Sequence, residues 1–209
     1  MAESAPSDDR GMVLIISGPS GVGKTTIKDH VQRELGARFS VSLTTREKTF
    51  RDADGRDYHF VNSEQFHKRR EAGEFLEWAD VHGNCYGTLA APVERALAAG
   101  ELIILEIDVQ GAIQVKEKIP GAFAIFVLPP GEEELLRRLR DRAREGESDI
   151  QGRFAKAKHE IHRARTCEAY DAFIVNDDLS QAVDEAVRFV RERLCGARDR
   201  RPPTEGDAP

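Results

Sequence analysis

Short apolar runs alternate with longer amphipathic stretches along most of the chain. Four of these runs have the length of buried strands and lie at residues 12–16, 102–107, 123–128 and 173–175. Elsewhere, apolar residues recur at helical spacing, most clearly over residues 150–164 and 183–194. Uniformly apolar strands separated by helices are typical of a parallel sheet that helices cover on both faces. We therefore predict an α/β fold, with both helical stripes in its core.

The segment 39–96 follows a different pattern. Short alternating strands are expected around residues 58–61 and 75–81, and Asn62 with Gln65 three residues later forms a capping-box signature that begins a helix. We assign this segment to an inserted mixed α/β lobe. The body of the fold is then expected to comprise residues 11–38, 97–131 and 159–195.

Residues 132–158 form a third unit, which we interpret as a small helical lid. The lid begins as a charged helical hairpin, with Gly146, Ser148 and Asp149 at its tip. Because it offers few large apolar side chains, we expect it to be weakly anchored and mobile. Residues 1–10 and 196–209 are rich in charge, Pro, Gly and Ala, so we expect both to be disordered tails.

Composition narrows the class of protein. The formal net charge of −6 gives no general attraction for a phosphate backbone, so nucleic acid is not an expected partner. The apolar runs are too short for a signal segment or a membrane span. Cys85, Cys167 and Cys195 form no CxxC pair, which fits a reducing compartment, and we expect a cytoplasmic protein.

Residues 18–25 carry the strongest chemical signal, the glycine-rich stretch Gly-Pro-Ser-Gly-Val-Gly-Lys-Thr. Its glycines let the backbone fold around phosphates with the N–H groups pointing inward, and it ends at a helix N-terminus, which favours anions. Lys24 is placed to reach the β and γ phosphates of ATP, and Thr25 to ligate Mg²⁺. An ordinary glycine-rich turn is the alternative, but the strand–loop–helix context favours a P-loop. The expected ATP-binding residues here are Gly18, Pro19, Ser20, Gly21, Val22, Gly23, Lys24, Thr25 and Thr26.

Two acids follow the apolar run 102–105. At the end of such a strand, a carboxylate like that of Glu106 would hold the water shell of the metal, as in a Walker-B element. Asp108 is the second acid. Acids at strand ends are common, so this signal is weak by itself.

Further segments, which follow one another in the order and spacing of the family, together resemble guanylate kinase. The resemblance spans residues 12 to 194. They are Ser-Val-Ser-Leu-Thr-Thr-Arg at 40–46, Gly-Arg-Asp-Tyr at 55–58, Glu-Phe-Leu-Glu-Trp-Ala at 74–79, Gly-Asn-Cys-Tyr-Gly-Thr at 83–88, Glu-Ile-Asp-Val-Gln-Gly at 106–111 and Asn-Asp-Asp at 176–178. The resemblance implies Mg²⁺-dependent transfer of the γ-phosphoryl group of ATP to GMP, and to dGMP. It also implies that segment 39–96 binds GMP. Monomer and homodimer both stay open.

The resemblance assigns roles at the acceptor site. Glu77 with Thr88 and Asp108 would read guanine, because a carboxylate accepts from guanine N1–H and the exocyclic amine at once, whereas adenine presents an acceptor at N1. The residues implied at the GMP phosphate are Ser42, Arg46, Tyr58 and Tyr86.

The resemblance also assigns catalytic residues. Arg138, Arg142 and Arg153 match the lid arginines of the family and would act together with Lys24. Asn176 joins the ATP-binding set. His159 and His162 share a helix face, but no third ligand is identifiable, so we interpret them as solvated rather than metal-bound.

The chain departs from the family pattern in four places, which are Leu43, Thr49, Glu106 and segment 141–143. Glutamate at 106 can still serve a hydrated metal. Thr49 stands where the family has a second phosphate-binding arginine. We favour Arg51 as the replacement over Lys48, because Arg51 projects to the same side as position 49 and binds phosphate bidentately. The alternative is that Arg51 pairs in solvent with Asp52 or Asp54.

Two other functions are open on the sequence alone. Guanylate-kinase-like domains also serve as non-catalytic peptide-binding modules of scaffold proteins, against which the intact Lys24 and Thr25 argue. A related kinase of sugar phosphates would leave a guanine-reading set such as Glu77 and Thr88 unpaired.

Overall fold

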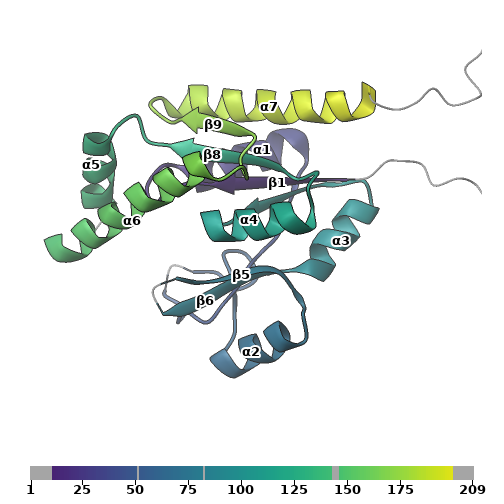
Figure 1. Cartoon of the computed structure of the whole chain (residues 1–209), viewed down its shortest axis with the longest axis horizontal. Helices are drawn as coiled ribbons and strands as arrows, with labels where there is room; N and C mark the ends of the chain where they lie inside the picture. Colours follow the sequence, from purple (N-terminus) through teal and green to yellow (C-terminus); the bar gives the residue numbers. More distant parts are fainter. Residues whose placement is uncertain (1–10, 51, 82, 143–145, 200–209) are drawn as a thin grey trace, which may run out of the picture.

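The computed structural model describes residues 11–50, 52–81, 83–142 and 146–199. Its centre is a five-stranded parallel sheet in the order β2–β7–β1–β8–β9 (Figure 1). The strands are β1 (Met12–Ser17), β2 (Arg38–Phe39), β7 (Leu102–Glu106), β8 (Phe123–Leu128) and β9 (Ala172–Val175). The α/β fold expected from the apolar runs is confirmed. The two-residue strand β2 was not expected, because a pair of residues shows no periodicity.

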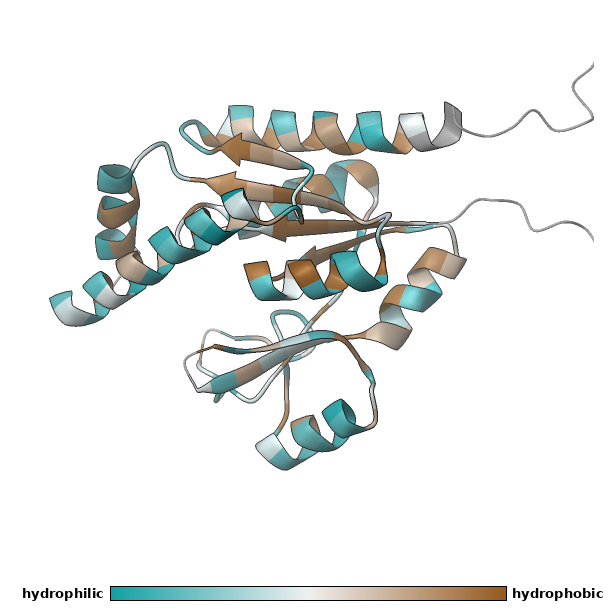
Figure 2. Cartoon of the chain, viewed as in Figure 1, coloured by the Kyte–Doolittle hydropathy of each residue, from teal (hydrophilic) through white to brown (hydrophobic). Residues whose placement is uncertain are grey.

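Helices cover both faces of this sheet, as Figure 1 shows, with α1 (Lys24–Leu35) and α7 (Leu179–Asp199) on one face and α3 (Ala90–Ala98) and α4 (Val109–Lys118) on the other. Alternate residues of β1 serve the two cores: Leu14 packs with the α1 and α7 side, and Ile15 with the α3 and α4 side. This explains why the strand is apolar throughout. In Figure 2 the strands are correspondingly hydrophobic, while the helices carry polar outer faces.

Two element boundaries differ from the sequence-based ones. Helix α3, placed in the inserted lobe by the boundary at residue 96, packs Val93 and Ala96 into the core of the main sheet. Helix α7 continues to Asp199, beyond the expected start of the tail at Gly196. One glycine costs a helix only about 1 kcal/mol relative to alanine, which does not end a helix by itself. The expected tail 1–10, and residues 200–209 of the expected tail 196–209, lie outside the described residues.

The second lobe has its own four-stranded sheet in the order β4–β3–β6–β5 and one helix, α2 (Ser63–Glu71). Its strands are β3 (Leu43–Thr44), β4 (His59–Phe60), β5 (Phe75–Val81) and β6 (Asn84–Leu89). Phe66 of α2 stacks on Phe75 with ring centroids 4.5 Å apart, which joins helix and sheet. The capping box of Asn62 and Gln65 is present and begins α2 as expected.

The helical hairpin consists of α5 (Glu132–Arg142) and α6 (Glu147–Thr166). Leu135 and Leu139 of α5 are fully buried, and Ile150 of α6 joins them in the core beneath α1 and α7. The expectation of weak anchoring is therefore wrong at the base of α5, because two leucines one helical turn apart suffice to bury its inner face. None of the described helices is long and apolar enough to span a membrane.

Candidate active site

An open cavity of about 420 Å³ lies where the carboxyl ends of β1 and β7 face the second lobe. Many of the residues expected at the site line it, and so do several that were not expected. Its polar lining residues include Ser20, Lys24, Thr25, Lys28, Ser42, Arg56, Tyr58, Glu77, Tyr86, Glu106, Asp108, Lys156 and Glu160. The structure thus brings the glycine-rich loop, the second lobe and α6 to one space.

The glycine-rich loop connects β1 to α1. Gly21 and Gly23 have φ angles of 89° and 91°, which L side chains rarely adopt, so these positions require glycine. Lys24 lies over the loop and donates from Nζ to the carbonyl oxygens of Gly18, at 2.6 Å, and of Pro19, at 3.0 Å. The ammonium is therefore held at the loop that should receive the phosphates.

Asn176 lies behind this loop. Its buried side-chain amide donates to the carbonyl oxygen of Val22 at 2.7 Å, and a Cβ atom at Gly23 would come within 2.5 Å of that amide. Asn176 therefore supports the loop from β9 and does not line this cavity. The other expected ATP-binding residues that do not line it are Pro19, Gly21, Val22, Gly23 and Thr26.

Thr25 and Glu106, expected at the metal, are neighbours in space. The Thr25 hydroxyl donates to Glu106 Oε1 at 3.1 Å, across 81 positions of sequence. A hydroxyl and a carboxylate fit hydrated Mg²⁺, which prefers oxygen ligands. No group of three or more His, Cys, Asp or Glu in the described part of the chain could hold an ion.

Glu77, on β5, is buried on the cavity wall. It is 4% exposed and accepts a hydrogen bond from the Thr88 hydroxyl at 2.6 Å. Burial foremost, with a contribution from nearby Asp108, raises the pKa of Glu77 to about 7, against the opposing effect of that hydrogen bond. A Cβ atom at Gly111 would lie 2.6 Å from Glu77 Oε2, so a larger residue there would require the Glu77 carboxyl group to shift.

Asp108 and Ser42 also line the cavity. Asp108 begins α4 as its N-cap and accepts from the backbone N–H of Gly111 at 2.9 Å. The Ser42 hydroxyl lies 3.3 Å from that of Thr88, which is itself fully buried behind Glu77. Four of the residues expected at the acceptor therefore form one connected patch.

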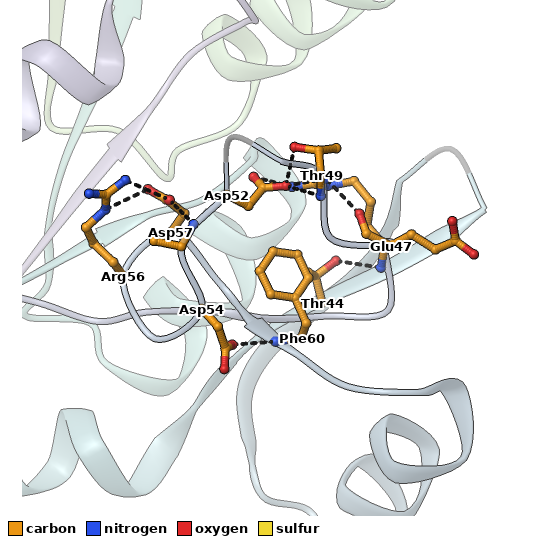
Figure 3. A network of polar contacts seen from close by, with 10 residues as sticks. Thr44, Glu47, Thr49, Asp52, Asp54, Arg56, Asp57 and Phe60 are labelled. Atoms are coloured by element: carbon orange, nitrogen blue, oxygen red, sulfur yellow. Dashed lines mark hydrogen bonds and ion pairs between the residues drawn. The ribbon is translucent and has the colours of Figure 1, made fainter.

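Arg46 does not line the cavity. Its guanidinium binds the Asp52 carboxylate through two hydrogen bonds of 3.0 Å and lies 5.5 Å from the ring centroid of Tyr58. Thr49 donates to the same carboxylate from its backbone N–H and its hydroxyl, at 2.7 and 2.6 Å, as part of the polar network in Figure 3. These donors, Arg46 foremost, hold the pKa of Asp52 well below its usual range. Thr49 thus stabilises the turn between residues 49 and 52 and does not line the cavity.

The two tyrosines expected at the acceptor phosphate both line the cavity. Tyr58 and Tyr86 meet edge to face, with ring centroids 5.6 Å apart. Asp54, an alternative partner considered for Arg51, accepts from the backbone N–H of Phe60 at 3.2 Å. Arg51 itself lies outside the described residues, so its role stays a prediction.

The hairpin reaches the glycine-rich loop. Arg153 of α6 donates to the Ser20 hydroxyl at 2.8 Å, across 133 positions of sequence. Arg138 of α5 lies beside Gly21, and its Nε donates to Glu134 at 2.6 Å. Arg142 falls within α5, but its side chain lies outside the described residues.

The structure adds cavity residues that the sequence reasoning missed. Lys156 and Glu160 lie one turn apart on α6, 3.7 Å from each other, and burial raises the pKa of Glu160. Arg56 and Lys28 also line the cavity. For Lys28 a signal existed, because it follows Lys24 by one helical turn.

Comparisons with known proteins agree with this geometry. The guanylate kinase family model matches residues 10–193. The guanylate kinase of Chelativorans sp. (strain BNC1) is 42% identical over 204 residues, covering 94% of this chain and 92% of that protein. That of Thermotoga maritima is 44% identical over 183 residues, covering 87% of each. The crystal structure of guanylate kinase from Anaplasma phagocytophilum superposes with a TM-score of 0.69 at 32% identity, covering 88% of this chain and 86% of that one.

Proposed function

This chain belongs to the guanylate kinase family. From that premise we propose which cavity residues bind ATP and which bind GMP during transfer of the γ-phosphoryl group. The resemblance found in the sequence is confirmed, and the chain is an ATP-dependent kinase of GMP. A non-catalytic scaffold module and a sugar-phosphate kinase are no longer needed as alternatives.

The observation that best supports separate ATP-binding and GMP-binding halves is that the glycine-rich loop and Glu77 line the same cavity. At the donor half, Lys24 and the loop would bind the phosphates of ATP. At the acceptor half, Glu77, Thr88 and Asp108 would read guanine, and Ser42, Tyr58 and Tyr86 would hold the GMP phosphate. Arg46 would join them by turning from Asp52 toward the phosphate.

The reaction asks for positioning rather than acid–base chemistry. The acceptor oxygen belongs to a phosphate that is already largely ionised at neutral pH, so no general base is required. Two polyanions must be brought into line, and Lys24 with Arg138, Arg142 and Arg153 would offset their repulsion. Thr25, and Glu106 through water, would hold Mg²⁺, and the bound ion would supply positive charge that offsets the charge of the phosphates.

The assignment is tested by ADP release measured over GMP, dGMP, AMP, CMP, UMP and ribose phosphates. We expect turnover with GMP and dGMP alone. We include dGMP because Glu77, Thr88 and Asp108 are assigned to the base, and no role depends on the 2′-hydroxyl. Comparable turnover with AMP would contradict the guanine-reading role of Glu77.

A monomer and a homodimer are both compatible with the cavity described. We also propose a cytoplasmic location, where ATP and GMP are available and thiols stay reduced; Cys85, Cys167 and Cys195 are free.

The raised pKa of Glu77 leads to a pH-dependence prediction. Only the ionised carboxyl group can accept both guanine donors, and burial raises the pKa of Glu77 to about 7. Below that pKa the ionised fraction of the free enzyme falls, so kcat/KM for GMP should drop about tenfold per pH unit. A profile of kcat/KM for GMP from about pH 5.5 to 8.5 measures this drop.

Glu77→Gln is the matched control, because GMP's own phosphate also titrates near pH 6 and remains in the variant. The variant should lose roughly 1 to 3 kcal/mol of GMP specificity, since its amide presents an N–H to one of the guanine donors. It should also lose the part of the pH profile that belongs to Glu77. Identical profiles for the two proteins would exclude Glu77 as the titrating group.

A further inference from the structure

Lys28 is a buried cation on the cavity wall for which no role has been assigned. It lies on α1 one turn after Lys24, and its side chain is 11% exposed. The ammonium lies 4.2 Å from the ring centroid of Phe39, another cavity residue, and 2.7 Å from Asp29 Oδ1. The aliphatic stem is therefore packed while the charged end stays beside the cavity.

This position is electrostatically unfavourable for a lysine. The first turns of a helix carry the positive end of its dipole, and the first turn of α1 has no acidic residue to offset it. Lys24 and Lys28 are also like charges at i and i+4, which repel each other. Asp29 offsets little, because its side chain is 58% exposed and such pairs contribute weakly. The fold thus places two lysines one turn apart at the start of α1, an arrangement that bound anions would stabilise.

The neighbours of Lys28 on the cavity wall indicate which anion it meets. Lys28 lies against Phe39, and the same cavity is lined by Arg56 and by Ser42 and Tyr58 of the proposed acceptor half. Arg46, the cation expected for the acceptor phosphate, is bound to Asp52 and lies off the cavity wall. Arg56 does line the wall, but its side chain is 75% exposed and its hydrogen bonds to Asp57 are long, at 3.4 and 3.2 Å. Lys28, by contrast, is a buried cation on the cavity wall.

We propose that Lys28 is a further acceptor-binding residue, whose ammonium leaves Asp29 to bind the phosphate of GMP and bring it into line with the γ-phosphate held near Lys24. The inference rests on the assignment of the acceptor half given above. It adds a donor from α1, so that a single helix would contact both phosphates that react.

Lys28→Met tests the proposal, because methionine keeps the stem that packs on Phe39 and removes the charge. KM for GMP should rise roughly tenfold to a hundredfold, while KM for ATP changes less than about twofold. Lys28→Arg should recover most of the loss. Asp29→Asn is the matched control: it removes the ion pair and should leave KM for GMP within about twofold of the original.

Two outcomes would overturn the proposal. If Asp29→Asn reproduces the effect of Lys28→Met, the ion pair is structural. If Lys28→Met raises KM for ATP alone, Lys28 serves the donor instead.

Thermal melting with and without GMP gives a readout that does not depend on turnover. Ligand-free Lys28→Met should melt no lower than the original protein, since the variant loses repulsion with Lys24. The rise in Tm caused by GMP should be smaller in the variant, because a lost contact weakens binding. An equal rise in both proteins would refute the role of Lys28, whereas no rise in the original protein would refute the acceptor site itself.

Discussion

Replacing Lys24 by Met should lower kcat by roughly a thousandfold while leaving the fold intact. The Lys24 ammonium is held over the glycine-rich loop by the carbonyl oxygens of Gly18 and Pro19, at 2.6 and 3.0 Å. Charge that develops on the transferring phosphoryl group would lose its nearest fixed cation, and methionine keeps the length of the side chain. Steady-state kinetics with saturating GMP measures the effect.

Binding of GMP to Lys24→Met serves as the control. Lys24→Met should keep the rise in Tm that GMP causes, because Lys24 is assigned to the donor half. A variant that turns over at the original rate would remove the central role assigned to the glycine-rich loop. A variant that melts much lower without ligand would instead show that Lys24 is structural.

Arg153→Ala should lower kcat by roughly a hundredfold to a thousandfold. The Arg153 guanidinium reaches Ser20 at 2.8 Å, so it already lies over the loop that holds the phosphates. Its contacts should strengthen as charge spreads during transfer, which affects kcat more than ground-state binding. KM for ATP should change less than about fivefold, and Arg153→Lys should recover only part of the rate, because lysine lacks the planar fork.

Arg165→Ala is the control on the same helix, since Arg165 is exposed in the last turn of α6. It should leave both kinetic constants unchanged. If Arg153→Ala raises KM for ATP and leaves kcat intact, Arg153 binds the ground state and its catalytic assignment is wrong.

The long strands of the main sheet could be predicted from sequence, as could β4 and β5 of the second lobe, but β3 and β6 could not. A run such as Phe123–Leu128 can be recognised in the sequence because all of its residues are apolar, as a strand buried on both faces requires. Strand β6 carries no such signal. Its Gly87 faces the ring of Phe75, and a Cβ atom at Gly87 would come within 2.8 Å of that ring. The strand therefore has a glycine where the neighbouring strand β5 has a large aromatic residue. The need for glycine at this position depends on a residue of another strand, which the sequence around Gly87 does not contain.

The site shows the same division between local and tertiary information. The loop at residues 18–25 is contiguous, so its chemistry can be recognised from sequence alone. The pairing of Arg46 with Asp52 depends on how the intervening loop turns, and the sequence suggested a phosphate-facing Arg46 instead. Glu160 becomes a cavity residue only because α6 packs with that face inward. Helical periodicity shows that such a face exists, but not what it meets.

The burial of Glu77 also has a consequence for folding. The pKa of this carboxyl group is about 7 in the folded chain against 4.5 as its usual value, so the folded state keeps a proton between these values that the unfolded state releases. The free energy of unfolding therefore falls as pH rises through this interval, by up to about 3 kcal/mol, and stays low above it. GMP binds only the folded chain and would supply donors to the ionised carboxyl group, which restores part of that stability. The residue proposed to select the substrate thus makes the neutral-pH stability of the enzyme depend on the substrate's presence.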